Sequence, residues 1–281
     1  MAIGNSVRLG RVVGGDGRSL IGTFAHGLLR GPLPGEGAAK DLGLMARQVS
    51  DLGLDAVMMS PGMLRASATD LAGRYGPGLI VCLEWNNAFR AGPSPSSDAE
   101  GRSAILGSVE DALSLGADGV ITYMFLGWSD RDAEARHVAH NAALSLECER
   151  LGVVRIIETM IRGREVTREE ELNADSVAMA ARMAYEVGCD MVKVEWPGTA
   201  ELLARVVEAC PAPILVAGGS LTSAADVLAM ASDALGAGAA GLVIGRNIVQ
   251  ATDRAALVRE LRLLVHGTPI TAQPSQPVAG H

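Results

Sequence analysis

The chain has almost no lysine, no excess of positive charge and no long apolar run. No apolar stretch reaches the roughly 18 to 20 residues that a helix needs to span a bilayer. The amino terminus also lacks the basic, apolar and small-residue order of a secretory signal. Acidic residues number 32 against 24 basic ones, a net charge of −8, and such a chain has no field that attracts a nucleic-acid backbone. We therefore expect a cytoplasmic protein without membrane or nucleic-acid partners.

The cysteines do not form the pattern of a disulfide framework or a zinc site. They lie in apolar stretches and no two have CxxC spacing; they are Cys82, Cys148, Cys189 and Cys210. Such cysteines are typical of buried, reduced thiols. His137 and His140 are three residues apart in a helical stretch, but no carboxylate or cysteine pattern completes a metal site around them. We expect no metal and no separate cofactor.

A repeated unit organises the chain, which at 281 residues could form one large barrel or two smaller domains. Four segments pass from polar helical residues through a glycine into a short apolar run, at Gly53, Gly116, Gly152 and Gly188. Glycine just past a helix supplies the left-handed residue that ends it, and the apolar run is typical of a strand buried on both faces of a parallel sheet. The unit is therefore one strand plus one helix.

Eight such strands are predicted, with helical stretches between them. They fall at residues 20–25, 56–60, 79–84, 119–124, 155–160, 190–195, 213–217 and 241–244. Eight alternating strand and helix units predict an α/β fold, a (β/α)8 or TIM barrel over residues 20–266. The alternative is an open doubly wound sheet, but residues 31–35 do not match the glycine fingerprint that should follow its first strand.

The two ends of the chain are expected to lie outside the barrel. Residues 1–19 contain the turn-forming run Gly14-Gly15-Asp16-Gly17 and are predicted to form a short hairpin that caps the barrel. Residues 267–281 are rich in proline, glutamine and serine without an apolar period, and are predicted to be disordered.

One of the two lysines lies where a barrel does its chemistry. The basic residues are 22 arginines and only Lys40 and Lys193, so a lysine inside an apolar strand needs a reason. With a period of two, Met191, Lys193 and Glu195 face the barrel interior while Val192 and Val194 face the helices. A desolvated amine is more easily neutral and can attack a carbonyl carbon to form a Schiff base. The alternative is a structural salt bridge from Lys193 to Glu195 or Glu158.

The last two strands end in loops suited to phosphate. Gly218, Gly219 and Ser220 follow the seventh strand, and Gly245 and Arg246 follow the eighth. Backbone N–H groups at glycines can approach an anion closely, and loops after strands seven and eight of such barrels commonly bind phosphate. The alternative is that these glycines only make tight turns.

Six short segments of the chain form a recognisable set: Arg8-Leu9-Gly10-Arg11, Asp16-Gly17-Arg18, His26-Gly27, Val192-Lys193, Ala217-Gly218-Gly219 and Gly245-Arg246-Asn247-Ile248. Together they resemble the motifs of the archaeal-type class I fructose-bisphosphate aldolase superfamily. This group includes 2-amino-3,7-dideoxy-D-threo-hept-6-ulosonate synthase and the autoinducer-2 thiolase. The resemblance implies that Lys193 forms the Schiff base, that the last two loops hold a substrate phosphate, and that the protein is a homo-oligomer.

Two family positions carry different residues here. Members of the family have Asp before the His-Gly pair, where this chain has Ala25. The aldolases of the family also have a Tyr at the position where this chain has Met160. Neither alanine nor methionine can move a proton. We expect the inward carboxylates Glu158 and Glu195 to do so instead, unless each forms a structural ion pair with Arg162, Arg164 or Lys193. Further residues expected to contact the substrate are His26, Glu84 and Tyr123.

The sequence therefore predicts a metal-independent enzyme of the class I aldolase type, a lyase or transferase that uses a covalent imine through Lys193. It would make or cleave a C–C bond in a phosphorylated ketose or related oxo compound. Two alternatives stay open: acyl transfer or isomerisation by the same lysine, and a non-catalytic phosphosugar-binding protein. A lysine kept in a nearly lysine-free chain argues against the last.

Overall fold

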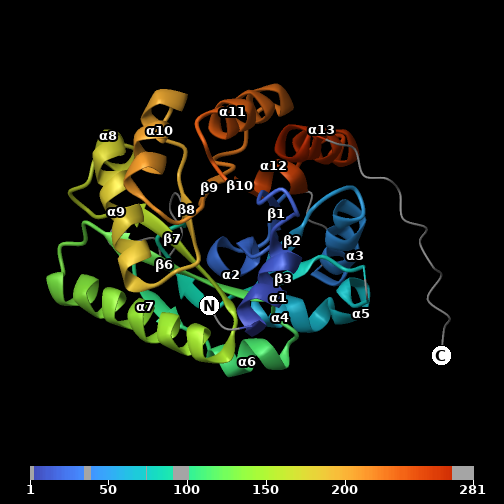
Figure 1. Cartoon of the computed structure of the whole chain (residues 1–281), viewed down its shortest axis with the longest axis horizontal. Coiled ribbons are helices and arrows are strands. Elements are labelled where there is room, and N and C mark those ends of the chain that lie inside the picture. The colour runs from blue at the N-terminus through green and yellow to red at the C-terminus, as the bar shows by residue number, and fades with distance from the viewer. Residues whose placement is uncertain (1–2, 35–38, 74, 91–100, 268–281) are drawn as a thin grey trace.

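Short runs of buried apolar residues form eight parallel strands that close into a barrel (Figure 1). The computed structural model describes residues 3–34, 39–73, 75–90 and 101–267. The barrel strands are β1 (Ser19–Thr23), β2 (Ala56–Met59), β3 (Gly78–Cys82), β6 (Gly119–Leu126), β7 (Val154–Ile161), β8 (Met191–Val194), β9 (Ile214–Ala217) and β10 (Gly241–Ile244). They pair in the order β1-β10-β9-β8-β7-β6-β3-β2. The predicted (β/α)8 barrel is confirmed, with each strand within a few residues of its expected position.

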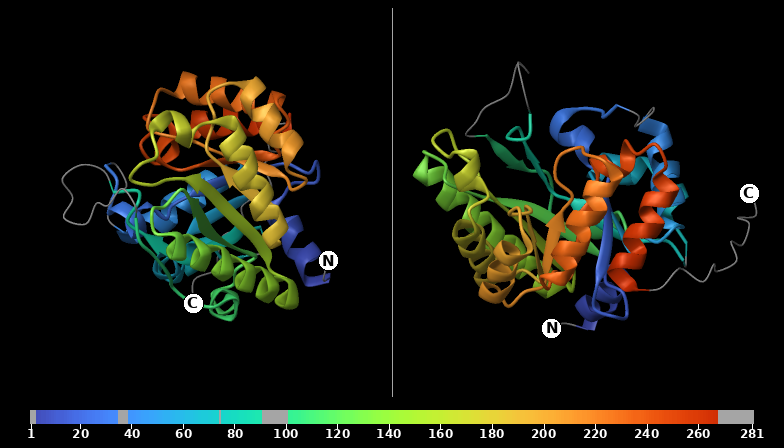
Figure 2. Two further views of the ribbon diagram at one scale, coloured as in Figure 1. Left: turned by 90° about the vertical axis from the view of Figure 1, so that its left-hand side faces the viewer. Right: turned by 90° about the horizontal axis from the view of Figure 1, so that it is seen from above.

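Helices surround the barrel and connect its strands (Figures 1 and 2). Their bounds are α1 (Ile3–Val12), α2 (His26–Arg30), α3 (Ala39–Ser50), α4 (Pro61–Ala66), α5 (Ala68–Leu71), α6 (Val109–Ser114), α7 (Arg131–Leu151), α8 (Arg168–Glu171), α9 (Ala174–Val187), α10 (Ala200–Ala209), α11 (Ala224–Gly236), α12 (Arg246–Val249) and α13 (Arg254–His266). Gly152 and Gly188 end α7 and α9 with φ of 67° and 102°, the left-handed role predicted for them. Among the described residues, no helix is long and apolar enough to cross a membrane.

Alternation along the strands divides the apolar residues into two packed layers. One layer fills the barrel interior and includes Ile21, Ile121 and Met191. The other lies between strands and helices and includes Val192 and Val194. The inward and outward faces predicted for the sixth barrel strand are therefore confirmed. The four cysteines are buried and free, and burial raises the pKa of each thiol.

The amino-terminal segment is a helix, so the predicted hairpin over residues 1–19 is wrong. In α1 the more buried positions are Asn5, Leu9 and Val12, which recur at the spacing of a helix face rather than of a strand. The glycine-rich run still makes a turn, in which the Gly14 N–H donates to the carbonyl of Arg18 at 2.7 Å. That turn connects a helix to β1 instead of two strands.

Polar contacts hold α1 against the amino-terminal ends of the strands. The Arg11 guanidinium forms an ion pair of 2.9 Å with Asp118, just before β6. The Asn5 amide donates to Asp190, just before β8, at 2.9 Å. The helix therefore closes the bottom of the barrel, opposite the end where the strands finish.

A two-stranded arm interrupts the unit after β3. Strands β4 (Glu84–Asn86) and β5 (Ser103–Ile105) pair antiparallel outside the barrel. The sequence predicted one strand through Glu84, but β3 ends at Cys82. The arm carries the Phe89 ring to within 5.3 Å of the ring of Tyr123, between ring centroids. It therefore covers part of the barrel mouth.

A histidine ties the last helix to the barrel bottom. His266 lies at the end of α13, and its two ring nitrogens contact Asp16 at 2.8 Å and Asp55 at 2.9 Å. Asp55 also accepts the N–H of Leu20 at the start of β1. The hydrogen bond to Asp55 raises the pKa of His266. Gly267, predicted to begin a disordered tail over residues 267–281, instead ends the helix with φ of 68°; the rest of that prediction, residues 268–281, lies outside the described residues.

Replacing His266 by Gln should destabilise the protein more at low pH than at high pH. Because the folded-state pKa is raised, the protonated imidazole stabilises the native state fully below about pH 6.5, and this contribution is lost as pH rises through the folded-state value. We expect the free energy of unfolding to fall by about 1 to 2 kcal/mol at pH 6 and by less at pH 9. Urea denaturation measures it, with His140→Gln on the exposed face of α7 as control. An equal loss at both pH values would contradict the assignment.

Candidate active site

A row of three polar side chains crosses the barrel interior. Tyr123 on β6, Glu158 on β7 and Lys193 on β8 are register neighbours, so their side chains face inward at the same level. Lys193 is 7% exposed and Glu158 is 5% exposed. The Nζ atom of Lys193 lies 2.7 Å from Oε2 of Glu158. The predicted inward lysine is thus paired with a carboxylate on the next strand.

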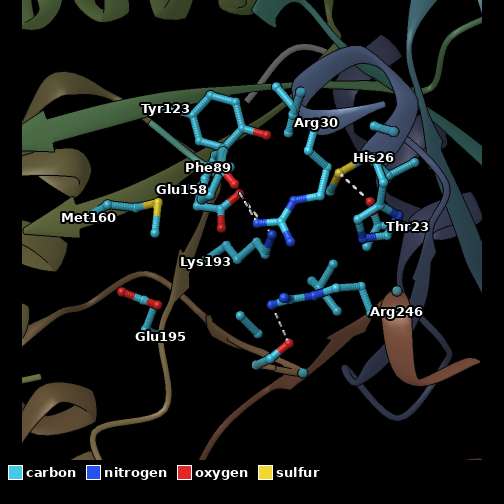
Figure 3. Close-up of a pocket in the computed structure, with 18 residues that line it drawn as sticks. Thr23, His26, Arg30, Phe89, Tyr123, Glu158, Met160, Lys193, Glu195 and Arg246 are labelled. Atoms are coloured by element: carbon cyan, nitrogen blue, oxygen red, sulfur yellow. Dashed lines mark hydrogen bonds and ion pairs between the residues drawn. The ribbon is translucent and has the colours of Figure 1, made fainter. Parts of the chain in front are cut away.

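This row lies in a cavity of about 110 Å³ at the carboxyl ends of the strands (Figure 3). Most of the residues predicted for the site line it: His26, Tyr123, Glu158, Lys193, Glu195, Gly218, Gly219, Gly245 and Arg246. Ala25 and Met160, the two positions where family members carry Asp and Tyr, also line it. These residues lie on or directly after six of the barrel strands, and Met58 of a seventh strand, β2, also lines the cavity.

Glu195 lies beside the cavity with its charge already paired. It follows the last residue of β8, and its carboxylate lies 2.9 Å from Nη2 of Arg162. Arg162 in turn pairs with Glu171 at 2.7 Å. Of the two predicted proton-transfer groups, Glu158 contacts the lysine and Glu195 contacts an arginine.

Glu84 lies away from the cavity, so the structure does not support it as a substrate contact. Its carboxylate accepts the backbone N–H of Tyr123 at 2.7 Å and contacts Nε2 of His137 at 2.6 Å. The side chain is fully buried. Because β3 ends at Cys82, Glu84 does not lie on the inner face of the barrel. Its hydrogen bond with the backbone of Tyr123 instead holds β6 in place. Within the described residues, no three His, Cys, Asp or Glu side chains are grouped to hold a metal.

Burial sets the protonation of Tyr123 and His26. Burial, with the nearby Cys82 and Glu158, raises the pKa of Tyr123 well above its usual value, so its phenol stays protonated. Burial and the positive charges of Arg246, Lys193 and Arg30 lower the pKa of His26 to about 3. The imidazole is therefore neutral at physiological pH.

The two glycine loops are fastened together at the cavity edge. The Asn247 amide donates to the carbonyls of Gly218 at 2.8 Å and Ser220 at 3.1 Å. Nη2 of Arg246 donates to the carbonyl of Gly219 at 2.6 Å. Ser220 does not line the cavity, and its side chain is exposed.

Two further glycine properties shape these loops. Gly219 has φ of 66°, in the left-handed region that favours glycine. A Cβ on Gly245 would lie 2.4 Å from both Cε1 of His26 and Cγ2 of Thr23. The β10 loop can therefore approach β1 and α2 only with glycine at this position.

Sequence reasoning missed three residues that build the site. Arg30, at the end of α2, and Phe89, on the arm, both line the cavity. Asn247 holds the loops together, although it was noticed only as part of a motif. The spacing from His26 to Arg30 is one helical turn, which was the one signal that could have found Arg30.

The chain is similar in sequence to an aldolase and to a synthase of two other organisms. It is 31% identical over 265 residues to an uncharacterized aldolase of Saccharolobus solfataricus, covering 94% of this chain and 95% of that protein. It is 31% identical over 268 residues to the 2-amino-3,7-dideoxy-D-threo-hept-6-ulosonate synthase of Halobacterium salinarum, covering 94% and 92%.

The fold of the chain is also similar to solved structures of archaeal aldolases. An archaeal fructose 1,6-bisphosphate aldolase superposes with a TM-score of 0.79 at 27% identity, covering 94% of this chain and all of that one. An archaeal fructose-1,6-bisphosphate aldolase with its catalytic lysine bound to a carbinolamine intermediate gives 0.78 at 27% identity, covering 93% and 99%.

Fold, relatives and interior lysine together define an enzyme of the class I, Schiff-base aldolase type. More particularly, the chain belongs to the DeoC/LacD family aldolases, whose family model matches residues 22–251.

Substituting Gly245 by Ala should disturb the β10 loop. The added methyl would overlap His26 and Thr23, and such overpacking costs about 1 to 3 kcal/mol of unfolding free energy. Gly236→Ala, at the end of α11 with open space around it, is the matched control and should leave stability unchanged or slightly increased. Urea denaturation of both variants measures the difference. Equal stability of the two variants would contradict the close approach.

Proposed function

We propose that the protein makes or cleaves a C–C bond in a phosphorylated ketose or related oxo compound, with Lys193 as the nucleophile. The observation that carries the proposal is that the salt bridge between Lys193 and Glu158, the structural alternative considered for this lysine, lies at 2.7 Å in the lining of the cavity, where a substrate can reach it. A carboxylate at this distance can take the ammonium proton and leave a neutral amine next to the substrate carbonyl.

The proposed reaction begins with addition of the neutral amine to the substrate carbonyl. Nζ of Lys193 forms a bond to the carbonyl carbon as the C–O π bond breaks, and the oxygen takes from Glu158 the proton that Glu158 removed from the ammonium. Glu158 then accepts a proton from the nitrogen and passes it to the carbinolamine hydroxyl, which leaves as water, and the nitrogen lone pair forms the iminium on Lys193. The iminium accepts the electron pair of the C–C bond that breaks, or supplies the enamine that forms one. No metal or separate cofactor is needed for these steps.

Glu158 is the proposed proton carrier. It lies on the strand next to Lys193 and is almost fully buried, so the barrel holds its carboxylate beside Nζ of Lys193. Glu195 is bound to Arg162 and would have to leave that ion pair to act. Ala25 and Met160 supply no proton donor, whereas Glu158 lies within hydrogen-bond distance of Nζ of Lys193.

The proposed phosphate site is the pair of loops after β9 and β10. Gly218, Gly219 and Gly245 expose backbone beside the cavity, and Arg246 supplies a positive charge. Charge-assisted hydrogen bonds from arginine to phosphate are among the stronger ones in proteins. A cytoplasmic location and a homo-oligomeric state stay predictions from the sequence.

Borohydride should fix the imine as a permanent adduct on the wild type and not on Lys193→Met. The protein is incubated with a panel of phosphorylated ketoses and aldehydes, reduced with borohydride in the presence of EDTA, and weighed as an intact chain. The matched control is Lys40→Met, which removes the other lysine and should trap like the wild type. Equal adducts on wild type and Lys193→Met would contradict the Schiff base. Loss of trapping in EDTA that zinc restores would contradict metal independence.

Glu158→Gln should form the trapped imine more slowly, though to the same extent on long incubation, and should turn over poorly. Removing a general acid or base typically lowers kcat by about 10² to 10⁴-fold while leaving the nucleophile in place. Glu195→Gln should lose much less, because that carboxylate is bound to Arg162. Single-turnover trapping and steady-state kcat for the substrate found by trapping measure the two effects. A wild-type kcat in Glu158→Gln would show that the proton moves through another group.

A further inference from the structure

Two arginines enter the cavity, and neither forms an ion pair within the described part of the chain. Nη2 of Arg30 donates to the carbonyl of Phe89 at 2.7 Å. Nη2 of Arg246 donates to the carbonyl of Gly219 at 2.6 Å. Both arginines therefore donate hydrogen bonds to neutral carbonyl groups, and hydrogen bonds to a negatively charged group would be stronger.

The backbone brings the two guanidinium groups to the same part of the cavity. Arg30 lies four residues after His26, on the same face of α2. The backbone of Gly245 lies against the His26 ring, and Arg246 is the next residue. Figure 3 shows both side chains reaching into the pocket, one from α2 and one from the β10 loop. Burial lowers the pKa of both groups, and the charge of Arg30 lowers that of Arg246 further.

A count of charges around the cavity leaves these two arginines unbalanced. Lys193 is balanced by Glu158. The charge of Glu195 acts on Arg246, but the close ion pair of Glu195 is with Arg162. His26 is neutral. The remaining two positive charges match a phosphate monoester, which carries up to two negative charges at neutral pH.

We propose that Arg30 and Arg246 close on one and the same phosphate of the substrate. Arg30 is then a second phosphate-binding residue, supplied by the first strand-helix unit rather than by the last two. The inference rests on the proposed function, since it takes the phosphate to lie at the β9 and β10 loops. On binding, Arg30 exchanges a hydrogen bond to the neutral Phe89 carbonyl for charge-assisted bonds to phosphate oxygens.

Calorimetric titration with inorganic phosphate at constant ionic strength tests the proposal. The variants are Arg30→Gln and Arg246→Gln, with Arg259→Gln on the exposed face of α13 as a control of equal charge change. We expect each pocket variant to weaken phosphate binding by about tenfold or more, and the control to bind like the wild type. Circular dichroism checks that each variant is folded. If Arg30→Gln does not fold, Arg30→Met, which keeps the aliphatic stem, takes its place.

The outcomes separate the two proposals. Wild-type affinity in Arg30→Gln or its Met substitute, together with weakened binding in Arg246→Gln, would overturn the role of Arg30 and leave the loop site intact. Wild-type affinity in both variants, or no phosphate binding by the wild type, would overturn the loop site and the role of Arg30 together. Weakened binding in both, with an unchanged control, supports the shared phosphate.

Discussion

The buried ion pair of Lys193 and Glu158 is the interaction around which the site is arranged. Removing two charges from water costs several kcal/mol per ion, and a buried pair often stabilises a protein less than apolar residues of the same size would. The apolar interior layer of the barrel includes Met160 and Met191, which are close in sequence to the two members of the pair, and the ring of Tyr123. A charged pair in such a place is better explained by chemistry than by stability.

The sequence was sufficient for those features that depend on local periodicity. Short apolar runs, four of them after a glycine, located all eight barrel strands, because a strand buried on both faces is largely apolar. The period of two placed Lys193 and Met191 inside and Val192 outside, since side chains alternate strictly along a strand. Lys193 stood out because the chain otherwise uses arginine.

The features that sequence reasoning missed depend on contacts between distant segments. The amino-terminal segment was expected to be a hairpin because its glycine run favours a turn, yet α1 is stabilised by Asp118 and Asp190, more than 100 residues away. Glu84 was placed on the wrong face because the end of β3 is set by the arm that follows it. Arg30 lies outside the strand pattern, and only the folded chain brings it into the same cavity as Arg246.

The two ends of the barrel have different roles: contacts between distant segments lie at the bottom, and the candidate active site lies at the top. At the bottom, α1, the glycine turn and the His266 cluster join the first and last segments of the described chain. At the top lie the lysine, the glycine loops and the arm. The packed barrel interior separates the two sets, which share no side chain. Because substitutions without shared partners tend to be additive in free energy, stabilising changes at the bottom could be accumulated without altering substrate preference. The top could in turn diverge toward new substrates while the bottom keeps the barrel closed.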